Sequence, residues 1–225
     1  MNSVLRTHAR IGERALLLTT AIVPLTGWAV HATVLHRQLA ATRRDPLTGL
    51  LRRDTYTLRA RRILRRHGAN TTVILVDQDH FKGVNDRFGH AAGDTVLAAT
   101  AERLTRWAGP HAAIGRLGGD EFAVVVNLPA EGRRLRLEQL VGMLCAPVRL
   151  SDGRTVAVGA SVGAASPDVL GVHELSALQR AADAALYDGK HSGRAVLANA
   201  AHTTIPTVNG RRAGRPGTHI WGRAA

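Results

Sequence analysis

The sequence has a single cysteine, Cys145, and few aromatic residues, which make up 4% of its 225 positions. One cysteine permits no intramolecular disulfide and no zinc site built on thiolates. The eleven histidines show no H-E-x-x-H spacing or similar pattern for a transition metal. Few aromatics also leave few side chains on which nucleic-acid bases could stack. These shortages argue against a disulfide scaffold, a zinc enzyme and a single-strand nucleic-acid binder.

Acidic residues are also scarce, with 17 Asp and Glu against 30 Lys and Arg, so the formal net charge is +13. The excess lies mostly outside the middle of the chain. Residues 45–195 carry a net +4, the segment before them +5 and the segment after them +4. A nucleic-acid-binding domain would concentrate positive charge on its folded surface. We therefore expect no nucleic-acid partner.

One long run without formal charge stands near the N-terminus, from Ala15 to His36, after a basic flank over residues 1–14. About 20 mostly apolar residues span a bilayer, so this run predicts one transmembrane helix. A buried helix and a secretory signal, with a cleavage site at Val30-His31-Ala32, are the alternatives. Arginines are more numerous after the run than before it. This bias predicts a single-pass protein of the cell membrane whose C-terminal side is cytoplasmic.

The rest of the chain divides into a helical connector over 37–44, a folded domain over 45–195 and a basic tail from Val196. The tail has little periodicity, which predicts disorder. Hydrophobic patterning in the domain predicts the order α-β-α-β-β-α-β-β-α, which indicates an α+β fold with helices flanking a sheet. The predicted helices cover residues 52–67, 93–107, 133–145 and 173–189, and the predicted strands cover 72–76, 112–117, 122–128, 148–150 and 155–165.

Two glycines followed directly by two carboxylates separate two of these strands, in Gly118-Gly119-Asp120-Glu121-Phe122. Glycines allow a tight turn between strands and leave room for a phosphate and its metal. The turn therefore brings the acidic groups of Asp120 and Glu121 to an edge of the sheet. Asp77 directly follows the apolar run over 72–76. A carboxylate at the end of a buried strand needs a counter-charge. A divalent ion shared with Asp120 would supply one.

The segment after Asp77 carries further polar candidates. Backbone N–H groups at the predicted turn through Phe81 and Lys82 could hold a phosphate. Asn85 and Asp94 offer an amide and a carboxylate, which together match the O6 acceptor and the N1–H and N2–H donors of guanine. The plain alternative for such residues is turn formation and helix capping, and Asp94 is also placed to cap the next helix.

A third set of candidates follows the last predicted helix, in Asp188-Gly189-Lys190 and in Gly193-Arg194. Lys190 and Arg194 could place two cations on a triphosphate. Cation capping of the helix C-terminus is an adequate alternative for Lys190 alone.

Between Asp45 and Arg194 the chain resembles the GGDEF-family diguanylate cyclases in five ordered blocks: D-P-L-T-G-L, D-Q-D-H-F-K-G-V-N-D, G-H-A-A-G-D, G-G-D-E-F, and A-D-A-A-L-Y-D-G-K with a following G-R. The resemblance implies a fold like nucleotidyl-cyclase and polymerase palm domains, with an antiparallel-rich central sheet. It also implies that a homodimer condenses two GTP into cyclic di-GMP, with Mg²⁺ or Mn²⁺ as cofactor.

By the same resemblance, Asp77 and Asp120 hold the metal with the carbonyl of Gln78. Asp120 or Glu121 assists removal of the 3′-hydroxyl proton. The remaining positions bind the substrate. Asn85 and Asp94 read guanine, and the phosphates are contacted by Phe81, Lys82, Lys190 and Arg194. The family's inhibitory product site, R-x-x-D, falls on Gly109 and Ala112 and is absent.

The sequence therefore predicts a membrane-anchored diguanylate cyclase. One alternative is a non-catalytic GTP- or cyclic-dinucleotide-binding signalling module at the membrane. Another is a basic scaffold on the membrane surface, which would show no dependence on nucleotides.

Overall fold

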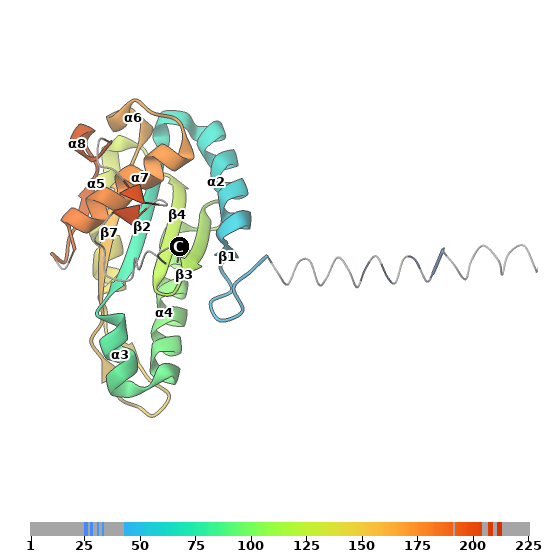
Figure 1. Cartoon of the computed structure of the whole chain (residues 1–225), viewed down its shortest axis with the longest axis vertical. Helices are drawn as coiled ribbons and strands as arrows, with labels where there is room; N and C mark the ends of the chain where they lie inside the picture. Colours follow the sequence, from blue (N-terminus) through green and yellow to red (C-terminus); the bar gives the residue numbers. More distant parts are fainter. Residues whose placement is uncertain are drawn as a thin grey trace, which may run out of the picture. The chain divides into compact units, whose positions relative to one another are not determined.

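Six strands form one mixed sheet in the order β1-β3-β4-β2-β7-β8 (Figure 1). The inner neighbours β3-β4, β4-β2 and β2-β7 pair antiparallel, whereas β1 and β8 join the edges in parallel. The predicted antiparallel-rich central sheet is confirmed. The strands are β1 (Leu51–Arg52), β2 (Thr71–Asp79), β3 (Ala113–Gly118), β4 (Glu121–Asn127), β7 (Gly159–Ala165) and β8 (Ala195–Leu197).

The computed structural model describes residues 43–190 and 192–203, together with residues 25, 26, 28, 31, 33, 207, 208, 211 and 212. Residues 1–43 and 44–225 form two separate units. Within the described residues, no helix has the length and apolar character needed to cross a bilayer. Most of the predicted transmembrane segment over 15–36 and of the predicted connector over 37–44 lies outside the described residues.

Helices cover both faces of the sheet (Figure 1). On one face, α2 (Arg53–His67) and α7 (Leu175–Asp188) pack against side chains such as Val73 and Val125. On the other, α4 (His90–Ala108) and α5 (Ala130–Leu144) pack against Ile74 and Val124. Side chains alternate between the two faces along each strand. Because β2 is apolar on both faces, it lies at the centre, with β4 and β7 on either side.

The shorter elements complete the unit. They are a 3₁₀ turn (Gly68–Asn70), α3 (Phe81–Phe88), β5 (Val148–Arg149), β6 (Thr155–Val156), α6 (Pro167–Leu170), α8 (Ala200–Thr203), β9 (Thr207–Val208) and β10 (Arg211–Arg212). The pairs β5-β6 and β9-β10 form two small antiparallel sheets.

The helix predicted from Gly93 begins three residues earlier, at His90, with Gly89 as its N-cap residue. Asp94 therefore lies inside α4 and does not cap it, so the capping interpretation is wrong. The predicted turn through Phe81 and Lys82 is instead the first turn of α3. Local composition favoured a turn because Gly83, Asn85 and Asp86 are all frequent in turns.

The folded part extends past Ala195, where the sequence predicted the start of a disordered tail. β8 pairs with β7 through Leu197, and α8 follows. Ala198 and His202 are buried, and Nε2 of His202 lies 3.2 Å from a carboxylate oxygen of Asp188. Contacts with β7 and α7 order residues 196–203, and such contacts leave no periodicity in so short a segment.

Candidate active site

The Gly-Gly turn joins β3 to β4, as the sequence predicted. Gly118 and Glu121 are paired across the hairpin, so Gly119 and Asp120 form the turn. Gly119 has φ of 51°, a conformation that glycine adopts at little cost. The N–H of Gln78 donates to the carbonyl oxygen of Asp120 at 3.3 Å. The turn is thereby held against the end of β2.

The register of the sheet brings acidic residues together at this end. Asp77 on β2 lies opposite Glu121 on β4 and Ser161 on β7. Strand alternation places Asp77 on the same face as Val73, which is the face covered by α7. Directly after α7, Nζ of Lys190 lies 2.7 Å from Oδ1 of Asp77. Lys190 therefore binds a buried carboxylate and is not simply a helix cap.

Asp120 shares an electrostatic environment with these groups. Burial raises its pKa above the ordinary value, repulsion from Asp77 and Glu121 raises it further, and the ammonium of Lys190 partly offsets the rise. The sheet register and the Lys190–Asp77 ion pair place these groups at the same end of the sheet, with Asp120 in the adjoining turn. The predicted grouping of Asp77, Asp120, Glu121 and Lys190 thus exists in the folded protein.

The donor set suits a divalent cation that is shared with a substrate. Among residues 43–190 and 192–203, no group of three or more His, Cys, Asp or Glu side chains is arranged to hold a metal unaided. Asp77 and Asp120 provide carboxylates, and Gln78 provides a backbone carbonyl. Mg²⁺ characteristically uses one or two carboxylates and completes its shell with water and substrate phosphates. The repulsion that raises the pKa of Asp120 is also what a cation would relieve.

The side chain of Gln78 is directed away from this cluster. Because side chains alternate between the two faces of a strand, Gln78 lies on the same face of β2 as Ile74 and Val76, the face covered by α4 and α5. Its Nε2 donates to Oγ1 of Thr100 on α4 at 2.8 Å, and both residues are buried. The side chain of Gln78 is therefore not directed at the carboxylates, and the resemblance assigns a role to its backbone carbonyl alone.

Helix α3 begins two residues after β2 ends. His80, in the left-handed region with φ of 56°, precedes the first helical residue Phe81, and no side chain caps the helix. The first N–H groups of a helix have no partner within it and attract phosphate. Lys82, which is exposed in the first turn, adds a mobile cation there.

Asn85 and Asp94 come from two adjacent helices. Asn85, half-buried on α3, places its amide against α4 at Gly93, the residue just before Asp94. Asp94 is exposed in the second turn of α4. The fold therefore brings Asn85 against the residue that precedes Asp94, although the 86–93 segment separates the two candidate guanine-reading residues in sequence.

Arg194 is not brought to the carboxylates by any contact of the described residues. It is exposed, and its N–H donates to Oγ of Ser192 at 3.3 Å. Lys190 is the cation of this segment that lies in the site.

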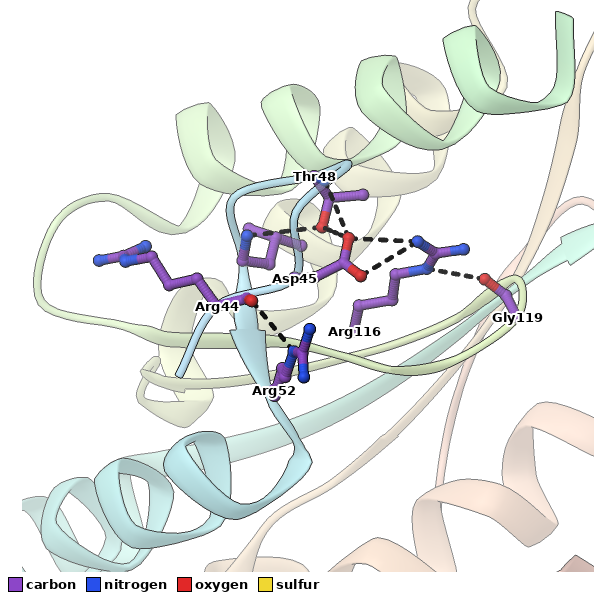
Figure 2. A network of polar contacts seen from close by, with 7 residues as sticks. Arg44, Asp45, Thr48, Arg52, Arg116 and Gly119 are labelled. Atoms are coloured by element: carbon purple, nitrogen blue, oxygen red, sulfur yellow. Dashed lines mark hydrogen bonds and ion pairs between the residues drawn. The ribbon is translucent and has the colours of Figure 1, made fainter. Parts of the chain in front are cut away.

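A second support of the turn, which Figure 2 shows, was not predicted from the sequence. Nη1 of Arg116 lies 3.1 Å from Oδ1 of Asp45, and its Nε donates to the carbonyl of Gly119 at 2.9 Å. Thr48 donates its N–H and hydroxyl to Asp45. Burial alone would raise the pKa of Asp45, but these hydrogen bonds and the charge of Arg116 lower it below the ordinary value. The start of the domain is thus tied to the Gly-Gly turn.

A signal for this support was present in the sequence. An Asp followed three residues later by Thr is a common turn pattern, and Arg116 stands just before the two glycines. A hollow of about 570 Å³ opens beside the network, lined by parts of the 45–54 and 116–119 segments. Arg52, exposed at its edge, donates from Nε to the carbonyl of Arg44 at 3.0 Å.

Comparisons with known proteins agree with the geometry. Residues 42–196 match the family described as "Diguanylate cyclase, GGDEF domain". An uncharacterised 19.3 kDa protein of Streptomyces ambofaciens is 47% identical over 174 residues, which cover 77% of this chain and 92% of that protein. Diguanylate cyclase TpbB of Pseudomonas aeruginosa is 40% identical over 156 residues, which cover 67% of this chain and 35% of that protein. The match to TpbB thus involves about a third of its length.

Solved structures show the same fold. The GGDEF domain of TpbB from Pseudomonas aeruginosa has 37% sequence identity and a TM-score of 0.64, with 71% of this chain and 96% of that chain covered. The coiled coil and GGDEF domain of DgcB from Caulobacter crescentus, solved in complex with cyclic di-GMP, has 28% identity and a TM-score of 0.65. That comparison covers 78% of this chain and 98% of that chain.

Proposed function

The chain belongs to the GGDEF domain family, and we propose that it is a diguanylate cyclase that condenses two GTP molecules into cyclic di-GMP with release of pyrophosphate. The observation that carries the proposal is the grouping of Asp77, Asp120 and Glu121 with Lys190 at one end of the sheet. Phosphoryl transfer depends mainly on positioning and on electrostatic stabilisation of the phosphate oxygens. A cluster of three carboxylates and a lysine supplies both the positioning and the electrostatic stabilisation.

The base and the phosphates would bind at neighbouring places. Asn85 and Asp94 would hydrogen-bond the edge of guanine, and adenine would leave them unpaired. The N-terminus of α3 and Lys82 would hold phosphate, because free N–H groups and a positive charge meet there. Lys190, next to Asp77, would contact the triphosphate, and we propose that Arg194 reaches it when substrate is bound.

We propose Mg²⁺ or Mn²⁺ as the cofactor, held by Asp77, Asp120 and the carbonyl of Gln78. When bound, the cation would neutralise negative charge on the triphosphate. Asp120 or Glu121 would take the proton of the attacking 3′-hydroxyl group. Asp120 is in the short turn, and Glu121 is the first residue of β4, so the hairpin fixes the backbone of both.

A homodimer is part of the proposal. One site with one guanine pocket binds one GTP, and the product joins two. Two protomers would face each other so that each 3′-hydroxyl meets the α-phosphate held by its partner. Holding both reactants in place converts a reaction between separate molecules into one within a complex.

We further propose that residues 15–36 anchor the protein in the cell membrane with residues 44–225 in the cytoplasm, where GTP is available. The support is the uncharged run of the sequence and the arginine bias after it. Fractionation of cells that express the full chain, with and without residues 1–36, tests this. Recovery of the full chain in the soluble fraction would contradict the anchor.

The function is tested by incubating the purified full chain with GTP and Mg²⁺ and identifying the product by mass spectrometry. We expect cyclic di-GMP and pyrophosphate from GTP and no cyclic product from ATP. A folded dimer that binds GTP without turnover would favour the non-catalytic signalling module. A protein whose thermal stability does not respond to GTP with Mg²⁺ would favour the membrane scaffold.

A further inference from the structure

Gly93 on α4 stands where the side chain of Asn85 meets the helix. A Cβ placed on Gly93 would lie 2.0 Å from Oδ1 of Asn85 and 3.1 Å from Cζ of Phe81. Real Cβ atoms essentially never approach another heavy atom within 3.0 Å. The carboxamide of Asn85 therefore occupies the space that any side chain at position 93 would need.

This close approach distinguishes Gly93 from other helical glycines of the unit. A Cβ on Gly132 or Gly142 of α5 would have no atom within 4 Å. At Gly163 of β7 the nearest atoms would be backbone atoms of α7. At Gly93 the atom closer than 3.0 Å is Oδ1 at the end of the flexible Asn85 side chain, which can rotate away. Cζ of Phe81, at 3.1 Å, would have to give by only a few tenths of an ångström. An alanine at position 93 would therefore move Asn85 and leave the packing of α3 on α4 in place.

The contact between Gly93 and the Asn85 amide matters for recognition of the base because Asp94 directly follows Gly93 in the chain. We propose that Gly93 is a positioning residue for guanine recognition: its missing side chain allows the Asn85 amide to lie on α4 beside the Asp94 carboxylate. The inference rests on the proposed function, since it assigns a role in binding the GTP base. To restore a 3.0 Å contact, alanine must displace Oδ1 by about 1 Å. A misplacement of that size can reduce a geometry-dependent activity by about 100-fold.

The test is a double-mutant cycle in the full chain with Gly93→Ala, Asn85→Ala and the double variant. Dissociation constants are measured by calorimetry for the α,β-methylene analogues of GTP and ATP, which cannot be turned over, in the presence of Mg²⁺. We expect Gly93→Ala to weaken the guanine analogue by roughly 10- to 100-fold and to change the adenine analogue little. The double variant should bind no more weakly than Asn85→Ala alone, because residues that act through one contact are not additive.

Gly142→Ala serves as the matched control, since Gly142 is an exposed helical glycine far from these groups in sequence and with open space around its Cα. Thermal unfolding of each variant separates folding from recognition, and Gly93→Ala should unfold near the wild-type temperature. Equal affinity of wild type and Gly93→Ala for the GTP analogue would overturn the role of Gly93 and leave the proposed function standing. Additive losses in the cycle, or a large drop in unfolding temperature that Asn85→Ala does not relieve, would also overturn it. A wild-type protein that binds no GTP analogue would overturn the proposed function and this inference with it.

Discussion

Nζ of Lys190 lies 2.7 Å from Oδ1 of Asp77, although 113 residues separate the two in sequence. The carboxylate side chain is only 8% exposed, and the lysine is 27% exposed. A buried carboxylate without a counter-charge is strongly unfavourable. Lys190 thus stabilises the fold before any substrate or cation arrives, and it joins the segment after α7 to the central strand.

Replacing Lys190 with Met should lower the stability of the metal-free protein, because Asp77 then loses its ion pair. The expected loss is about 1–3 kcal/mol, the usual penalty for a buried group deprived of a hydrogen-bond partner. Mg²⁺ should recover part of it, since the cation would replace the missing positive charge. Thermal unfolding with chelator and with Mg²⁺ measures both effects. Lys82→Met, which removes an exposed lysine, is the control, and equal unfolding temperatures for both variants would contradict the expectation.

Asp120→Asn should abolish turnover and keep the fold. The amide has the size of the carboxylate but removes a charge that faces Asp77 and Lys190. Loss of a metal-binding charge should reduce kcat by about 100-fold or more. Steady-state formation of cyclic di-GMP, with circular dichroism as the folding control, measures this. An active Asp120→Asn protein would move the essential acid to Glu121.

Asp120→Asn, which should abolish activity, should at the same time raise the stability of the folded protein. Burial and repulsion from Asp77 and Glu121 raise the pKa of Asp120 above the ordinary 3.8. The folded state therefore holds this proton more tightly than the unfolded state. The stabilisation is complete below about pH 3.8 and is lost as the pH rises through the raised pKa. In chelator, Asp120→Asn should gain stability over wild type between about pH 4 and pH 7. An unfolding-temperature difference that stays constant over this range would argue against the shift.

Product inhibition should be weak. Gly109, with φ of 75°, ends α4, and Ala112 is buried before β3. These residues stand where the family's product site has Arg and Asp, so position 109 supplies no guanidinium for a product phosphate. The guanidinium of Arg59, which lies at this segment, donates to the carbonyl of Pro110 at 2.7 Å. Initial rates should not change with added cyclic di-GMP at about micromolar levels, apart from competition with GTP. Inhibition that persists at saturating GTP would show a separate product site.

Gly163→Ala should loosen α7 from the sheet. A Cβ there would lie 2.1 Å from the carbonyl oxygen of Ala182 and 2.4 Å from the backbone N of Leu186. Because backbone atoms cannot rotate away, helix or strand must shift, at about 1–3 kcal/mol or more. Chemical denaturation measures the loss, with Gly142→Ala as control. Wild-type stability in Gly163→Ala would contradict the close packing.

Much of the site could be predicted from short stretches of the chain. The apolar run before Asp77, the Gly-Gly turn before Asp120 and the helix before Lys190 are local patterns, because backbone conformation responds to neighbouring residues within a few positions. Asp77, Glu121 and Lys190 lie together with the turn residue Asp120, and Asn85 and Phe81 lie against α4 at Gly93. The helix over 81–88 was missed because Gly83, Asn85 and Asp86 favour turns, and in the folded protein Phe81 and Asn85 of this helix lie against α4 at Gly93.

The sequence by itself thus determined which residue types stand at the ends of which strands and helices. The tertiary structure decided which of them meet. Strand register, set by many weak contacts across the sheet, places Asp77 opposite Glu121 and directs Gln78 to the other face. The pairs Lys190–Asp77 and Arg116–Asp45 depend on chain segments far apart in sequence. Neither pair is visible in a local pattern, because each forms only when packing brings the two segments together, and partial burial then strengthens the attraction between the charges.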